Sequence, residues 1–108
     1  MRLKHNVKLT SLTTQAALGM CIVSAVYHRL DPSSSCTFTS VNDSKHGDNS
    51  LHYDGNAFDV RTKDFTANKQ YLVQEVKAAL GPDYDVVLEA LGTDNEHLHV
   101  EYQPKGNS

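Results

Sequence analysis

The sequence predicts an α+β domain in which two helices pack on one face of a small, largely antiparallel sheet. Three observations support this prediction: helical apolar spacing in each half of the chain, short β-branched or alternating segments, and turn residues between them. The order helix, strand, strand, helix, strand, strand is typical of this fold class. At 108 residues, the chain is expected to form one domain, 1–108.

The first half of the chain is expected to form one helix and one strand. The helix is predicted over 12–30, with Ser11 as its N-cap and Asp31-Pro32 forbidding its continuation. The segment 36–41 is β-branched and aromatic enough for a strand. A polar loop then leads to His52. The apolar residues that recur at helical spacing in 12–30 are Leu18, Ile22 and Val26.

The second half is expected to form three strands and one helix. The strands are predicted over 57–62, 84–90 and 96–102. The helix follows Thr66, its predicted cap, and is closed by Gly81-Pro82. Its apolar stripe consists of Leu72, Val73, Val76 and Leu80.

Alternation within two of these strands predicts which side chains face a site. Asp59 and Arg61 share one face of their strand, and Phe58 and Val60 share the other. The later strand repeats the pattern, with polar His97, His99 and Glu101 alternating with Leu98, Val100 and Tyr102. The polar set is therefore expected to face a site and the apolar set a core.

Composition argues against several classes of partner. The net charge is −3 and no basic block is present, so the case for binding nucleic acid or an anionic membrane surface is weak. No stretch approaches the twenty apolar residues that span a bilayer. Cys21 and Cys36 lack C-x-x-C spacing and are interpreted as buried free thiols. We expect a monomer that acts on a small or neutral substrate, without membrane insertion.

Four of the six histidines lie in two short segments beside acidic residues, which favours a metal site. Catalytic zinc takes three protein ligands and leaves one position for water. His52, Asp59 and His99 supply such a set, and Glu96 stands three residues before His99. A bend entering that strand would bring the Glu96 carboxylate beside the attacking water as a general base. A solvated strand face explains the H-x-H pattern equally well.

The quoted segments also resemble a known family. "SLHYDGNAFDV", residues 50–60, resembles the S-x-H-x-x-G-x-A-x-D signature of the M15 family of zinc peptidases, and "EHLH" resembles its E-x-x-H. That family comprises D-alanyl-D-alanine carboxypeptidases, dipeptidases and phage L-alanyl-D-glutamate endopeptidases. The resemblance implies that His52, Asp59 and His99 bind Zn²⁺ and that Glu96 is the base.

The same stretch is similar to the amino-terminal signalling domain of Hedgehog proteins, which shares the peptidase fold. There, "SLHY" followed by an acidic residue and glycine matches closely, as does an H-x-H strand, and His46 has a counterpart. The resemblance covers roughly 37–102 and implies a Hedgehog/DD-peptidase-like fold. Hedgehog domains do not keep a glutamate three residues before the last histidine, so Glu96 favours an active enzyme.

One departure from the peptidase pattern concerns substrate binding. Many relatives carry an arginine before the first ligand, where "TSVNDSKHG" offers Asp43 and Lys45 instead. Arg61 is a candidate substitute, and a structural ion pair beneath the site is its alternative. His46 and His97 are candidates for polarising an oxyanion or orienting a ligand; as ordinary loop and strand residues, they need no role.

Together these observations predict a zinc metallopeptidase that hydrolyses D-amino-acid-containing peptides of bacterial peptidoglycan, as a carboxypeptidase or an endopeptidase. The alternative is a zinc-stabilised, non-catalytic module of the Hedgehog kind. Basic residues before the apolar run Ala16–Val26 imitate a signal peptide, but we interpret the run as the first helix. We therefore expect cytoplasmic synthesis, by a phage or by a bacterium that exports the protein to its wall by another route.

Overall fold

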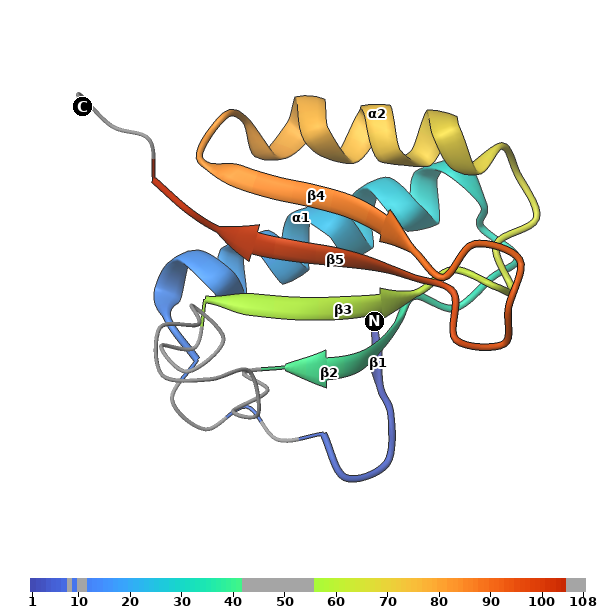
Figure 1. The fold of residues 1–108 in the computed structure, drawn as a ribbon, viewed down its shortest axis with the longest axis horizontal. Coiled ribbons are helices and arrows are strands. Elements are labelled where there is room, and N and C mark those ends of the chain that lie inside the picture. Colours follow the sequence, from blue (N-terminus) through green and yellow to red (C-terminus); the bar gives the residue numbers. More distant parts are fainter. Residues whose placement is uncertain (8, 10–11, 42–55, 105–108) are drawn as a thin grey trace.

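A computed structural model of the protein describes residues 1–7, 9, 12–41 and 56–104. The chain forms β1 (Arg2–Leu3), α1 (Thr14–Leu30), β2 (Thr37–Val41), β3 (Ala57–Arg61), α2 (Lys69–Leu80), β4 (Tyr84–Glu89) and β5 (His97–Tyr102). The strands lie in the order β1-β2-β3-β5-β4, with β1 parallel to β2 and every other pair antiparallel. The predicted α+β class is confirmed, and α1 crosses behind the strands in Figure 1.

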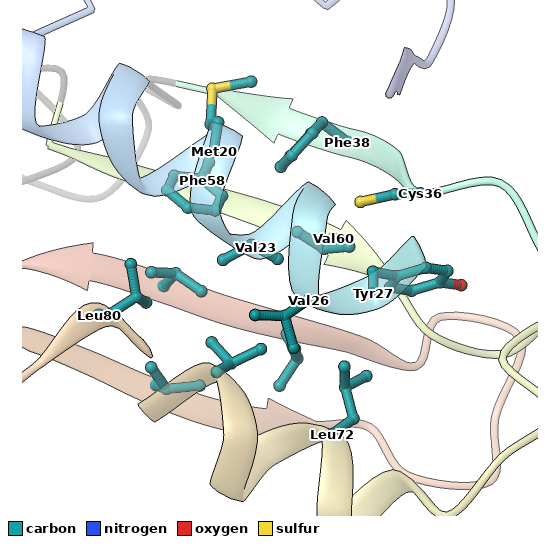
Figure 2. Close-up of a cluster of buried hydrophobic side chains, with 14 of the residues drawn as sticks. Met20, Val23, Val26, Tyr27, Cys36, Phe38, Phe58, Val60, Leu72 and Leu80 are labelled. Atoms are coloured by element: carbon teal, nitrogen blue, oxygen red, sulfur yellow. The ribbon is translucent and has the colours of Figure 1, made fainter. Parts of the chain in front are cut away.

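The core fills the space between the two helices and one face of the sheet. Figure 2 shows Met20, Val23 and Tyr27 of α1 beside Phe38, Phe58 and Val60 of the strands. Helix α2 adds its predicted stripe to the same cluster, with Leu72 and Val76 fully buried. Because both helices cover one face, the opposite face of the sheet is left for polar side chains. We call this second face the outer face.

Glycine allows α1 to approach the sheet closely. A Cβ added at Gly19 would lie 3.1 Å from a Tyr84 ring carbon and 3.2 Å from a Phe58 ring carbon, closer than ordinary van der Waals contact. Of the apolar residues predicted along this helix, Val26 is buried and Ile22 packs against the core, partly buried. Leu18 is 55% exposed, whereas Gly19, Met20 and Val23 face the sheet.

Both helix starts differ from the predicted caps. Thr13 caps α1 by accepting a hydrogen bond from the Ala16 N–H (3.1 Å). Asn68, and not Thr66, caps α2. Thr66 donates instead to Asp31, through both its backbone N–H and its hydroxyl (2.8 Å each). The predicted Ser11 cap lies outside the described residues.

The helix ends agree with the sequence prediction. Asp31 is the C-cap of α1. Gly81 ends α2 with φ +88°, a conformation that favours glycine. The thiol prediction holds for Cys36, which is buried, but is wrong for Cys21, which is exposed. Within the described residues, no helix is long and apolar enough to cross a membrane.

Candidate metal centre

The pairing of β3 with β5 brings the candidate polar residues together on the outer face. Asp59 lies opposite His99, and Arg61 lies opposite His97. Alternate residues of these strands, such as Phe58 and Val60, are fully buried against the helices. The predicted division of both strands into a polar and an apolar face is therefore confirmed.

The His99 ring lies between two carboxylates. Its Nδ1 is 2.8 Å from Asp59 Oδ1, and its Nε2 is 3.0 Å from Glu101 Oε1. All three side chains are less than a quarter exposed, so water screens the contacts only in part. The hydrogen bond to Asp59, reinforced by Glu101, raises the pKa of His99 to about 9 although burial opposes this. Without a metal, the ring is therefore charged at neutral pH.

The Asp59–His99 pair fits one edge of a zinc site. Two ligands of a tetrahedral zinc, each about 2.0–2.1 Å from the ion, lie about 3.3 Å apart. The observed 2.8 Å between Asp59 Oδ1 and His99 Nδ1 is a hydrogen-bond distance, and a shift of a few tenths of an ångström would admit the ion. Nδ1 would then bind zinc while Nε2–H donates to Glu101, the carboxylate–histidine arrangement common at zinc sites.

The third predicted ligand, His52, lies outside the described residues, as does His46. Among the residues that the structure does describe, no group of three histidine, cysteine or acidic side chains is suited to hold a metal. The structure thus brings two of the three predicted ligands into contact and does not test the complete set.

The Glu96 carboxylate is nearly fully buried and is held by three hydrogen-bond donors. It accepts hydrogen bonds from the Thr62 hydroxyl (2.6 Å), the Lys69 ammonium (2.8–3.0 Å) and the Gly92 N–H (3.1 Å). Thr62 is fully buried and follows Phe58 and Val60 on the helix-covered side. Glu96 thus joins the end of β3, α2 and the β4–β5 turn, and its role as a base stays a prediction.

These contacts also fix the charge of Glu96. Burial of its carboxyl opposes ionisation, but hydrogen bonds from Lys69, Thr62 and Gly92 outweigh this and lower its pKa. The ammonium of Lys69 neutralises the charge locally. Glu96 is thus a buried, ionised and fully engaged structural group in this geometry.

Glu101 was expected on the polar, site-facing side of its strand but was given no role at the metal site. Its side chain is only 17% exposed, and its carboxylate accepts a hydrogen bond from His99. Two-residue spacing in a strand was the available signal, because Glu101 shares a face with His99.

His97 and Arg61 flank the pair on the outer face. His97 Nε2 lies 2.9 Å from Glu89 Oε1, and Nδ1 lies 2.7 Å from the Asn95 carbonyl. Burial opposes protonation of His97, but these two acceptors and nearby Asp59 outweigh it and raise its pKa. Arg61 lines a polar pocket beside His97. Within the described part of the chain it forms no ion pair, so the structural alternative for Arg61 gains no support.

Comparison with family models finds the Hedgehog amino-terminal signalling domain, matched over residues 34–100. The match spans more than half of the chain and includes β2, β3, α2, β4 and most of β5. Comparison with curated proteins and with solved structures gave no match.

Proposed function

Because the chain belongs to the family of Hedgehog amino-terminal signalling domains, which shares its fold with zinc peptidases, we propose that it is a zinc-dependent metallopeptidase. Its substrates would be D-amino-acid-containing peptides of bacterial peptidoglycan. The observation that carries this proposal is the His99 ring held between Asp59 and Glu101 on the outer face of the sheet. His52, Asp59 and His99 would hold the ion.

A zinc ion held there supplies a Lewis acid and an activated water near neutral pH. The chain's own residues have separate tasks. Glu101 accepts the Nε2 proton of His99, which fixes the tautomer whose Nδ1 points to Asp59. His97 lies on the same face, and its contacts with the Asn95 carbonyl and Glu89 raise its pKa, which favours a positive group near a carbonyl that develops negative charge.

A second candidate function is a zinc-stabilised binding module without hydrolysis. Two observations favour it: the family match, and the hydrogen bonds that tie the Glu96 carboxylate to Thr62, Lys69 and Gly92. The presence of Glu96 is therefore a weaker argument for catalysis than its sequence position indicates. Both candidates require zinc at the same residues.

Digestion of defined muropeptides separates the two candidates. The zinc-loaded protein is incubated with peptidoglycan tetra- and pentapeptides, and the products are identified by mass. A peptidase yields shortened peptides and carries one zinc per chain. His99→Ala should abolish both zinc binding and cleavage, whereas His28→Ala, which changes an exposed histidine of α1, should preserve both. One bound zinc with no cleavage of any muropeptide would establish the binding module and refute the enzyme.

A further inference from the structure

A polar pocket of about 200 Å³ is lined by Arg61 and His97, which follow and precede the Asp59–His99 pair along β3 and β5. It is lined by side chains that include Lys4, Thr39, Arg61, Lys63, Asp94 and His97. Arg61 and His97 are cross-strand partners, two residues along each strand from Asp59 and His99. Both pairs therefore face the same side of the sheet, and the pocket continues the candidate site along the strands. We call it the Arg61 pocket.

The Arg61 pocket carries an excess of positive charge. Lys4, Arg61 and Lys63 contribute three cations, and no ion pair involves them in the part of the chain that the structure describes. Asp94 brings one negative charge to the pocket; Glu96 is also a lining residue, but its carboxylate is already paired with Lys69. The pocket is thus suited to a small anion.

Arginine gives the pocket a preference among anions. The guanidinium of Arg61 offers a planar fork of donors that matches a carboxylate, and its strand position is fixed by pairing with His97. A volume of about 200 Å³ equals that of roughly six or seven water molecules. This is room for one small amino-acid residue.

The spacing also matches one residue of peptide. Two residues along a strand correspond to about 7 Å. One amino-acid residue extends at most about 3.6 Å, and a charge-assisted hydrogen bond adds about 2.8 Å. A carbonyl at Asp59–His99 and a carboxylate at Arg61 can therefore belong to adjacent residues.

We propose that the Arg61 pocket binds the C-terminal carboxylate of the peptide, so that the protein releases single C-terminal residues as a carboxypeptidase. This inference rests on the proposed peptidase function. In the reaction, water adds its hydroxyl to the carbonyl carbon of the last peptide bond, and its proton goes to the departing amine. In an endopeptidase, the peptide chain would instead continue through the position that the C-terminal carboxylate would occupy.

The test compares two substrates that differ only in terminal charge. The zinc-loaded protein is given acetyl-L-lysyl-D-alanyl-D-alanine and the same peptide with a C-terminal amide. We expect kcat/KM to be about ten- to a hundredfold higher for the free carboxylate, the range of one hydrogen bond to a charged group. Equal cleavage of both peptides would overturn the pocket assignment while leaving the peptidase function intact.

Substitutions of arginine test whether Arg61 causes the preference for a free carboxylate over an amide. Arg61→Ala should reduce the carboxylate-to-amide ratio to near one, and Arg61→Lys should restore it in part, because lysine keeps the charge and loses the fork. Arg29→Ala removes an arginine of α1 that is paired with Glu75, and should leave the ratio unchanged. Retention of the full ratio in Arg61→Ala would contradict the proposal.

A binding measurement separates failure of the pocket from failure of the enzyme. Acetyl-D-alanine and its amide contain no cleavable D-alanyl-D-alanine bond, so NMR shifts of Arg61 and His97 report their binding without catalysis. Binding of the carboxylate alone, lost in Arg61→Ala, would support the pocket even if no muropeptide is cut. Absence of binding by either compound would refute the pocket, whatever the peptidase assay shows.

Discussion

The carboxylates on the two faces of the β3–β5 pair have different hydrogen-bond partners. On the helix-covered face, Glu96 receives hydrogen bonds from a hydroxyl, an ammonium and a backbone N–H. On the outer face, Asp59 and Glu101 share one imidazole, that of His99. Glu96 is thus satisfied by groups that bind no metal cation, whereas Asp59 meets a ring that is itself a metal ligand.

This difference separates a structural carboxylate from a functional one. Freeing Glu96 would leave a buried charge without its donors, a cost that holds the side chain in place. Releasing Asp59 from His99 requires only that a cation replace the ring proton, because both groups would then bind the same ion. The outer face is therefore the one on which a metal can enter without dismantling the fold.

The largest expected effect on stability comes from Glu96→Gln. Glutamine keeps the size of the side chain but loses the charge that holds Lys69, with an expected cost of about 1.5–3 kcal/mol in the free energy of unfolding. Urea denaturation of the zinc-loaded protein measures this. Glu75→Gln, which removes a largely exposed pair with Arg29, should cost only about 0–1 kcal/mol. If Glu96→Gln kept full stability but lost hydrolysis, Glu96 would be the base and the structural assignment would be wrong.

The next largest expected effect is on zinc affinity at the outer face. Glu101→Gln removes the carboxylate that orients His99, and we expect zinc affinity to fall about ten- to a hundredfold. Competition with a chromophoric chelator measures the dissociation constant. Glu89→Gln is the matched control, because Glu89 pairs with the neighbouring His97 and not with a predicted ligand. A larger loss of affinity in the Glu89 variant would show that His97, and not His99, binds the ion.

Local patterns predicted what depends on alternation and spacing. The faces of β3 and β5 follow from a period of two, so Asp59 and His99 were correctly placed on one side. The two-residue β1 was not predicted, because its pairing with β2 across more than thirty residues leaves no local pattern. Spacing also gave no sign of the partners of Glu96, because Thr62 and Lys69 come from other parts of the chain. The zinc set stays a prediction, because His52 lies outside the described residues.

The prediction of Thr66 as a helix cap was wrong for the same reason, a hydrogen-bond partner distant in sequence. This residue and its partner lead to the smallest predicted effect. Thr66 looks like a cap in the sequence, but its backbone N–H and hydroxyl both go to Asp31, which also accepts from Ser33 and Ser34. Asp31 is therefore a second carboxylate held by fixed donors, and it joins the end of α1 to the segment before α2. This places it with Glu96 in the structural class.

Asp31 should make the protein sensitive to acid. The Thr66 N–H, followed by the Ser34 and Ser33 hydroxyls, holds the pKa of Asp31 well below its usual range. In the unfolded chain, Asp31 takes up a proton near pH 4, about the ordinary pKa of an aspartate. In the folded chain, Asp31 stays ionised to lower pH. The stabilisation is therefore complete above about pH 4 and is lost as the pH falls further. Asp31→Asn should therefore flatten the decline in melting temperature between about pH 5 and 3. Asp94→Asn, at an exposed carboxylate, should keep the parental slope, and an unchanged slope in Asp31→Asn would show that Asp31 does not control acid stability.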